Sequence, residues 1–381
     1  MTWFHNFKLP LVFQSALLKN SAWGITANLL QTVFVSLFFV ILARQYSSED
    51  FAHFLIASTV YQILVAFSAM GLGPWFIREF EVTQDKPAFT SKFIKIQTGL
   101  GLLFYFFNIL IALALYPIGE IWWLSIVLGT NIIFDNIIYS IKNLNIAAHQ
   151  QKKTFVVLGI DGLLRMLVGC VLFVYPLSIV ALSIVLILLR FLTVNLFIRL
   201  GFSNSMSLRK LLAAKVIWED LKTQILINWR FAVIGSVSII YWRLANIFIA
   251  KNLSLQDVAD YEISFKIFSI FLVLPLMVSA TIYARFVKNF NLGDIKRLKN
   301  LYQKLFILYA VFSILVYAFI ISFGELLIPL MFGDKFAGAV DCSKEMFLTI
   351  LIAPTALLQA GLIVAMKFER IDMIFNIVSL V

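Results

Sequence analysis

The 381-residue sequence has few of the residues that build metal, disulfide or nucleophilic sites. Its two cysteines, Cys170 and Cys342, and its three histidines, His5, His53 and His149, show no ligand-like spacing. Structural metal sites and disulfide frameworks need several such residues at defined intervals. A glycine-rich phosphate loop and a nucleophile–base arrangement are also missing. These absences argue against a metal site, a disulfide scaffold and an ATP-driven motor.

Charged residues are scarce too, at 13% of the chain, whereas 61% of the residues are hydrophobic. A soluble globular chain is about half apolar and about a quarter charged. The composition therefore indicates a membrane protein with several spans, and its 38 Phe, 12 Tyr and 8 Trp suit lipid contact and interfacial belts. The N-terminus shows no small-residue cleavage site, so we expect no removable signal peptide.

Long apolar segments define the expected topology, because a helix needs about 20 mostly apolar residues to cross a bilayer. We predict an all-α polytopic membrane protein. Eleven segments qualify, the last of them cut short: 21–43, 51–77, 94–116, 119–141, 154–175, 177–199, 225–250, 258–284, 301–323, 345–366 and 370–381.

The two halves of the chain resemble each other at a constant spacing of 207 residues. Five pairs match without a gap: Arg44 with Lys251, Asp50 with Asp257, Ala52 with Ala259, Phe54 with Tyr261, and Arg78 with Arg285. Matches at equivalent helix ends indicate a duplicated bundle, a feature of transporters. We predict two related six-helix lobes around a central cavity, residues 1–207 (spans 1–6) and 208–381 (spans 7–11). The second lobe is expected to be truncated, with about 10–11 of 12 spans present.

Basic residues are distributed unevenly between the two sides that these spans define. With the N-terminus in the cytoplasm, 22 of the 31 Lys and Arg residues fall inside and only four outside, namely Arg44, Lys251, Lys335 and Lys344. Cytoplasmic loops carry such an excess, so it accounts for most of the net charge of +11 and removes the case for nucleic acid binding. No outer loop exceeds about 25 residues, which leaves little room for an outer catalytic domain.

Eight charged residues fall within the predicted spans, where a charge costs about 2.5–3.5 kcal/mol and usually faces a cavity or a partner. They are Asp135, Asp161, Arg165, Arg190, Arg230, Arg243, Glu262 and Lys266. Five of the eight are cationic, so a cavity that they line would carry an excess of positive charge.

Arg243 has no acidic residue close to it in the sequence. An unpaired arginine within a span requires an anion, either a diphosphate, whose geometry fits the planar guanidinium, or a carboxylate on another helix. Lys266 lies deeper in its span than Glu262, which is near the outer end and open to solvation, and we assign Lys266 a substrate contact. Arg190 faces the cavity or pairs with an acid on a neighbouring helix, and the sequence leaves both readings open.

Three further spans carry polar patterns with two readings each. Asn131 and Asp135 share a helical face, which forms either a cavity wall or a polar seam between helices. Asp161 and Arg165 are four residues apart and can pair, either as a self-neutralised structural pair or as a substrate or proton site. In the first span the stripe Asn20, Gly24, Asn28 and Gln31 forms part of the cavity wall or a helix-packing face.

Several stretches resemble Wzx-type polysaccharide flippases of the multidrug/oligosaccharidyl-lipid/polysaccharide superfamily. LLKNSAWGITANLLQ, ILARQYSSEDFAHF and GLGPWFIREF resemble the opening of these proteins, IYWRLANIFIAKNLSLQDVADYEISFKIFSIFLVLPL the start of their second half, and LLIPLMFGDKFAGAV the loop after their ninth span. The similarity covers most of the chain through apolar, loosely defined motifs. It implies a two-lobed protein with twelve spans and a cationic cavity. It also implies transfer of an undecaprenyl-diphosphate-linked oligosaccharide across a bacterial inner membrane for O-antigen, capsule or exopolysaccharide biosynthesis.

The resemblance also implies roles for individual residues. Asp135 and Asp161 become candidates for coupling to a proton or sodium gradient, with no other cofactor and no metal. The family usually has an acid two residues after the arginine of span seven, where this chain has Ala245. The residues expected to hold the diphosphate or the glycan are Arg243, Lys266, Arg165, Arg190, Asn28, Gln31 and Asn131.

The expected partners are the lipid-linked oligosaccharide, the bilayer, a polysaccharide polymerase and a chain-length regulator. Two alternatives stay open at this point. The first is a drug or peptidoglycan-precursor exporter of the same superfamily; a cationic drug favours an acidic cavity, and a peptidoglycan-precursor exporter is expected to have more spans. The second is a membrane glycan polymerase or ligase, which usually needs a sizeable outer loop with catalytic groups.

Overall fold

The computed structural model describes residues 16–201, 214–226 and 243–366, together with residues 368, 371, 374, 375 and 378. Helices make up almost all of this part of the chain, which contains no strand. Nine helices or helix groups in it are long and apolar enough to cross a membrane. The predicted all-α membrane protein is thereby confirmed. The predicted lobe boundary at 207/208, Arg230, and most of the predicted spans 225–250 and 370–381 lie outside the described residues.

Six candidate spans come from the first half of the chain. They are formed by α1 (Ala16–Gln45), α2 (Ser48–Ala69), α4 (Lys86–Leu115), α5 (Glu120–Gly129) joined to α6 (Asn131–Ala147), α7 (Gln151–Leu172) and α8 (Ile179–Leu196). The shorter elements of this half and of the connection are α3 (Gly73–Val82), η2 (Phe197–Gly201), α10 (Trp218–Leu221) and η3 (Lys222–Leu226).

The remaining three candidate spans come from the second half. They are α12 (Leu255–Asn291), α13 (Ile295–Phe332) and the group made of α14 (Gly338–Met346), η5 (Phe347–Leu351) and α15 (Ala353–Ala365). The one-turn helix η4 (Asp334–Phe336) connects α13 to α14, and residues 243–252 form a helix that leads into α12.

Some helix boundaries differ from the prediction because hydrophobicity marks the lipid-facing part of a helix and not its ends. The predicted span 51–77 breaks after Ala69, where Met70 adopts a left-handed conformation with φ of 50°. Two other helices begin earlier than predicted. In both cases a polar side chain caps the first turn, Asp85 accepting from the Ala88 N–H at 3.0 Å and Asp294 from the Arg297 N–H at 2.9 Å.

The duplication seen in the sequence extends to hydrogen bonds. Ser47 Oγ accepts from the Asp50 N–H at 3.1 Å before α2, and Ser254 Oγ accepts from the Asp257 N–H at 3.2 Å before α12. In each pair the serine hydroxyl also donates to the aspartate side chain, at 2.8 and 2.6 Å. These pairs are again 207 positions apart. The equivalent spans of the two halves therefore begin with the same helix cap.

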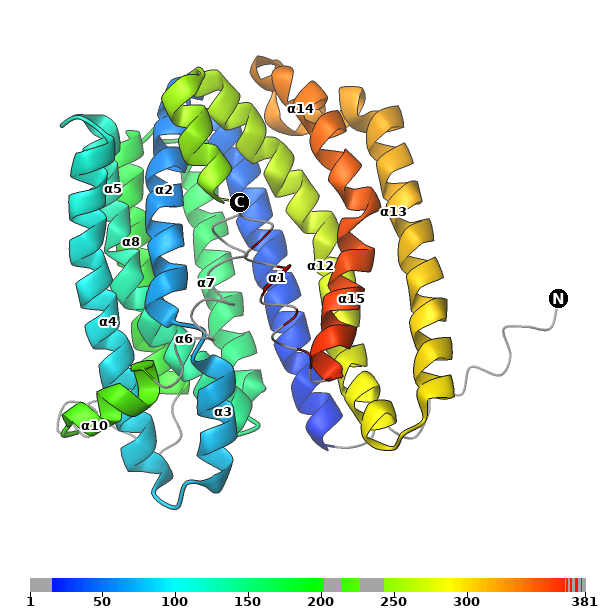
Figure 1. Cartoon of the computed structure of the whole chain (residues 1–381). Helices are drawn as coiled ribbons and strands as arrows, with labels where there is room; N and C mark the ends of the chain where they lie inside the picture. Colours follow the sequence, from blue (N-terminus) through cyan, green and yellow to red (C-terminus); the bar gives the residue numbers. More distant parts are fainter. Residues whose placement is uncertain are drawn as a thin grey trace.

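The helices form two bundles that meet at one end (Figure 1). The first contains α2 to α8 and the second contains α12 to α15, while α1 lies between them and packs along α7. At the end of the molecule where α2 begins and α13 ends, Phe51 of α2 contacts Phe336 with ring centroids 5.7 Å apart, and Phe39 of α1 contacts Phe332 of α13 at 6.2 Å. We call this the closed end.

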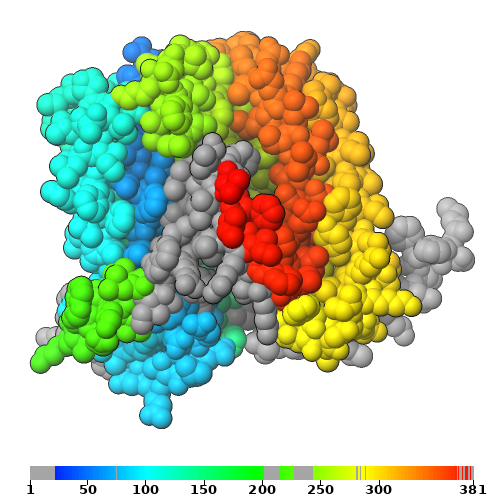
Figure 2. All heavy atoms as spheres, viewed as in Figure 1, coloured from blue at the N-terminus to red at the C-terminus, as the bar shows by residue number. Residues whose placement is uncertain are grey.

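Away from the closed end, the hydrophobic clusters of the described residues belong to one bundle each. Trp75, Phe76 and Phe93 pack together in the first bundle, and Phe286 and Tyr309 belong to a cluster of the second. Figure 2 shows the light-green segment leading into α12 lying across the closed end, between the first bundle and the orange helices of the second. In the part of the chain that the structure describes, the bundles are therefore held together mainly at one end, so relative motion is expected at the other.

Glycines on α7 allow α1 to approach closely, as is common between membrane helices. A Cβ atom added to Gly162 would lie 2.2 Å from Cδ2 of Phe34, and one added to Gly169 would lie 2.9 Å from Cδ1 of Ile41. At Gly159, by contrast, an added Cβ would lie 3.5 Å from Cδ2 of Leu30, an ordinary contact. Helices α1 and α7 therefore approach most closely at Gly162 and Gly169.

We expect Gly162→Ala to lower the thermal stability of the purified protein, because overpacking of this kind costs about 1–3 kcal/mol. Gly159→Ala is the matched control and should leave the unfolding temperature unchanged or slightly raised. Thermal unfolding in detergent measures both. Equal unfolding temperatures for the two variants would show that the α1–α7 contact is not limited by Gly162.

Candidate functional site

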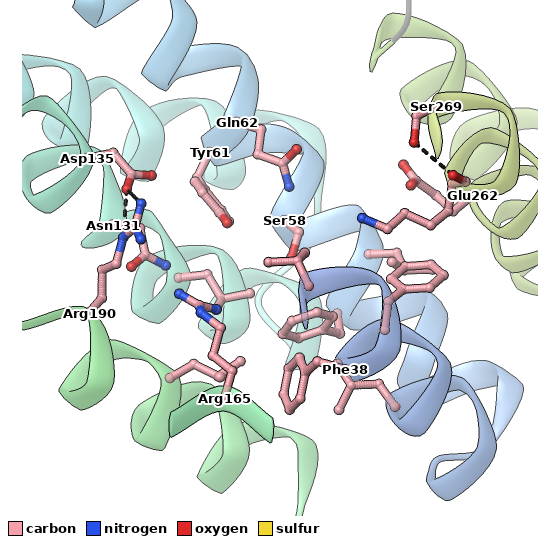
Figure 3. Close-up of a pocket in the computed structure, with 18 of the residues that line it drawn as sticks. Phe38, Ser58, Tyr61, Gln62, Asn131, Asp135, Arg165, Arg190, Glu262 and Ser269 are labelled. Carbon is pink, nitrogen blue, oxygen red and sulfur yellow. Dashed lines mark hydrogen bonds and ion pairs between the residues drawn. The ribbon is translucent and has the colours of Figure 1, made fainter. Parts of the chain in front are cut away.

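A cavity of about 400 Å³ lies between the two bundles (Figure 3). Its walls come from α1, α2 and α5 to α8 on one side, and from α12 and the helix before it on the other. Phenylalanines of α1, α2 and α12 supply much of the apolar lining. The polar and charged lining residues are Gln31, Ser58, Tyr61, Gln62, Asn131, Asp135, Arg165, Arg190, Arg243, Glu262, Lys266 and Ser269.

The structure brings seven of the nine predicted site residues to this one cavity. They are Gln31, Asn131, Asp135, Arg165, Arg190, Arg243 and Lys266. The other two lie elsewhere. Asn28 is exposed on α1 and does not line the cavity, and Asp161 is buried directly behind Arg165.

Two arginines of the first bundle are held by carboxylates of the same bundle. Arg165 Nε lies 3.0 Å from Oδ2 of Asp161, whose Oδ1 accepts from the Thr193 hydroxyl at 2.5 Å. Arg190 Nε donates to Oδ1 of Asp135 at 2.7 Å, and its Nη2 donates to the same oxygen. The pairing that the sequence allowed for Arg165 is therefore present, and Arg190 both pairs with a neighbouring helix and lines the cavity.

Arg243 is held by a carboxylate from a different helix. Its Nη1 donates to Oε1 of Glu262 at 2.7 Å, and its guanidinium carbon lies 5.1 Å from the ring centroid of Phe265. The carboxylate that the sequence lacks at Ala245 is thus supplied by α12. Glu262 is only 5% exposed, so the expectation that it is solvated near the outer end is wrong.

The same carboxylate takes part in a contact between the bundles. Asn246 Nδ2 donates both to Oε1 of Glu262 and to Oγ1 of Thr59 on α2, the latter at 2.8 Å. Asn246 and Thr59 are each 1% exposed. Hydrogen bonds of buried polar groups are costly to break without replacement, so this node joins α12 to α2 beside the cavity.

Lys266 differs from the three arginines in its partners. Its Nζ lies 5.7 Å from the ring centroid of Phe39, and among the described residues it forms no ion pair, whereas each arginine has a carboxylate oxygen within 3.0 Å. The charges of the site are four positive and three negative when Asp161 is included. The excess positive charge is therefore carried at the position of Lys266.

The sequence analysis missed several polar lining residues on α2. Ser58, Tyr61 and Gln62 occupy positions i, i+3 and i+4, a spacing that places them on one helical face and that was visible in the sequence. Figure 3 shows Tyr61 and Gln62 side by side on α2, and Ser58 below them. Gln62 and Ser269 are separated by the same 207 positions as the other repeat pairs, and both line the cavity. The duplication therefore contained a signal for these two residues.

Comparison with known proteins identifies both the family and the fold. The family model described as "Polysaccharide biosynthesis protein" matches residues 41–341, well over half of the chain. No curated protein sequence matches the chain. The similarity to solved structures covers most of the chain, but the sequence identity is low.

An inward-facing multidrug resistance MATE family transporter of the MOP superfamily has a TM-score of 0.71 and 12% identity, covering 91% of this chain and 83% of its own. A MOP superfamily transporter from Pyrococcus furiosus, whose binding pocket is described as having reverse polarity, has a TM-score of 0.60 and 12% identity, with 95% and 84% covered. Matches at such identities show the fold alone. Together with the family match, they confirm the resemblance to Wzx-type flippases: the chain belongs to the family described as polysaccharide biosynthesis proteins and has the fold of MOP superfamily membrane transporters.

Proposed function

We propose that this protein moves undecaprenyl-diphosphate-linked glycan units across a bacterial inner membrane, with its N-terminus in the cytoplasm. The observation that carries the proposal is the cavity between the bundles, lined by three arginines and by Lys266 with one positive charge in excess. A buried cationic excess favours an anionic ligand over the cationic compounds that an acidic cavity would take. A peptidoglycan precursor carries the same diphosphate. The proposed flippase and a peptidoglycan-precursor exporter would therefore differ in the glycan that they bind.

The physical task of such a protein is to replace the hydration of the head group. Sugars and a diphosphate cannot enter hydrocarbon unaided, because each polar group loses its hydrogen bonds to water. The hydroxyl, amide and guanidinium groups of the cavity offer replacement hydrogen bonds, while the polyprenyl tail stays in lipid. Rocking of the two bundles then exposes the cavity to one side and then to the other.

The unequal pairing of the four cations gives an order of contacts. Lys266 accepts an anion without giving up a carboxylate, so it makes the first contact with the diphosphate. Arg243, Arg190 and Arg165 then contact phosphate oxygens only by sharing or exchanging their present carboxylate partners. Such exchange conserves charge-assisted hydrogen bonds on the guanidinium.

The exchange also gives Asp135 and Asp161 a role in ion coupling. A buried carboxylate that loses its arginine is an uncompensated charge, which costs several kcal/mol in a protein interior. A proton or a sodium ion neutralises such a carboxylate in the substrate-free cavity, when the arginine has moved away. The ion leaves before the substrate binds, so the ion and the glycan occupy the cavity in alternation and move in opposite directions, as in antiport.

Neutralising Lys266 and Arg243 together should abolish most transport of a lipid-diphosphate glycan in proteoliposomes, with a loss of at least about tenfold if the two lose about 1.4 kcal/mol of binding. Lys266→Arg keeps the charge and should retain most of the rate. Lys344→Gln, a lysine that does not line the cavity, is the matched control. Unchanged transport in Lys266→Gln/Arg243→Gln would exclude this cavity as the diphosphate site.

Removing both the acid and its arginine tests ion coupling without leaving an unpaired charge. In Asp135→Asn/Arg190→Gln we expect a lower transport rate, because Arg190 is also a diphosphate contact, and a loss of the response of that rate to an imposed proton or sodium gradient. The paired change Asp161→Asn/Arg165→Gln is measured in parallel. A full gradient response in both double variants would remove these carboxylates from the coupling mechanism.

A further inference from the structure

Two basic side chains at the closed end link α1 and α13 reciprocally. Arg44, in the last turn of α1, donates from Nε to the Met331 carbonyl at 2.7 Å and from Nη2 to the Leu330 carbonyl, both in the last turn of α13. Lys335, just beyond α13, donates to the Tyr46 carbonyl just beyond α1. Each side chain therefore crosses from the end of its own helix to the end of the other.

A third basic side chain makes a similar contact in the opposite direction. Lys251, at the end of the helix that leads into α12, donates to the carbonyl of Leu115, the last residue of α4. Its Nζ also lies 4.5 Å from the ring centroid of Tyr116.

The contacts of Arg44 and Lys251 are related by the duplication. The two residues are the first of the pairs separated by 207 positions, and their acceptors are on α13 and α4, which are the third spans of their halves. A cation at the end of the first span of one half thus caps the third span of the other half, once in each direction. A local helix cap would not cross between the halves twice at equivalent places.

The last carbonyl groups of a helix lack partners within the helix, and the C-terminal end of the helix dipole is negative. A cation there makes charge-assisted hydrogen bonds, which are stronger than neutral ones. Because donor and acceptor belong to different halves, these bonds exist only while the bundles are close at this end. They therefore stabilise one conformation selectively, which is the condition for shifting a conformational equilibrium.

We propose that Arg44 and Lys251, supported by Lys335, form two symmetry-related latches that hold the closed end shut and release once in each transport cycle. The proposal goes beyond the proposed function, because the latches act on the conformational equilibrium whatever the cavity carries. Replacing them should shift the empty protein toward a conformation in which this end is open.

Lys344 provides a matched control at the same end of the molecule. Its Nζ lies 2.7 Å from Oε1 of Glu325 and 3.8 Å from Oδ1 of Asp341, and all three residues belong to the second bundle. Its replacement removes a basic charge of the same kind without removing a contact between the halves. An effect of charge alone would appear in both kinds of variant.

The test measures the distance between spin labels at Glu49→Cys on α2 and Glu345→Cys on α14 by pulsed electron resonance, in a full-length protein whose Cys170 and Cys342 are replaced by serine. Both label positions are exposed. In nanodiscs without substrate, Arg44→Gln/Lys251→Gln should raise the ratio of long to short distances about tenfold, equivalent to about 1.4 kcal/mol. Arg44→Lys/Lys251→Arg and Lys344→Gln should keep the original ratio.

An unchanged distance distribution in Arg44→Gln/Lys251→Gln overturns the proposal, and so does an equal shift in Lys344→Gln. If that double variant does not fold, as judged by thermal unfolding, Lys251→Gln and Lys335→Gln carry the test separately, and each should raise the same ratio severalfold. The measurement needs no substrate. The transport result for the cavity variants therefore does not affect the spin-label distances. The proposed latches and the proposed transport function can each be overturned without the other.

Discussion

The low dielectric between the bundles is the constraint on which the cavity depends. An isolated charge in such a place costs several kcal/mol, and pairing compensates it only where the geometry is good. Arg165, Arg190 and Arg243 meet this condition through carboxylates within 3.0 Å. The pairs keep a strongly charged cavity stable while it is empty, and they leave the positive excess at Lys266.

The same constraint explains how much of the site could be predicted. Charges within apolar segments are rare enough to be found by inspection, and five of the six charged residues expected at the site line one cavity. Their partners could not be assigned, because pairing between helices depends on how the helices rotate and cross. Glu262 shows this most clearly: its sequence position near a span end suggested solvent, whereas its helix turns it toward Arg243 and Asn246.

That the apolar segments of the described residues form helices was predictable for a simpler reason, since an apolar segment of sufficient length has few other structures open to it in lipid. Helix ends were predicted less well. Asp85 and Asp294 extend their helices beyond the apolar segments, and Met70 ends α2 within one. The spacing of 207 residues placed Asp50 and Asp257 at equivalent helix ends, and in the structure both take part in the same serine cap.

The hydrogen bonds that converge on Glu262 have a thermodynamic consequence. One carboxylate oxygen accepts from Arg243, which faces the ligand space, and from Asn246, which is bonded to Thr59 across the bundle interface. Ligand binding in the cavity and the distance between the bundles are therefore thermodynamically coupled, and such coupling is reciprocal. A ligand that draws Arg243 away from Glu262 weakens the contact that Asn246 makes with Thr59 of α2. By the same free energy, a movement of α2 changes the affinity for that ligand.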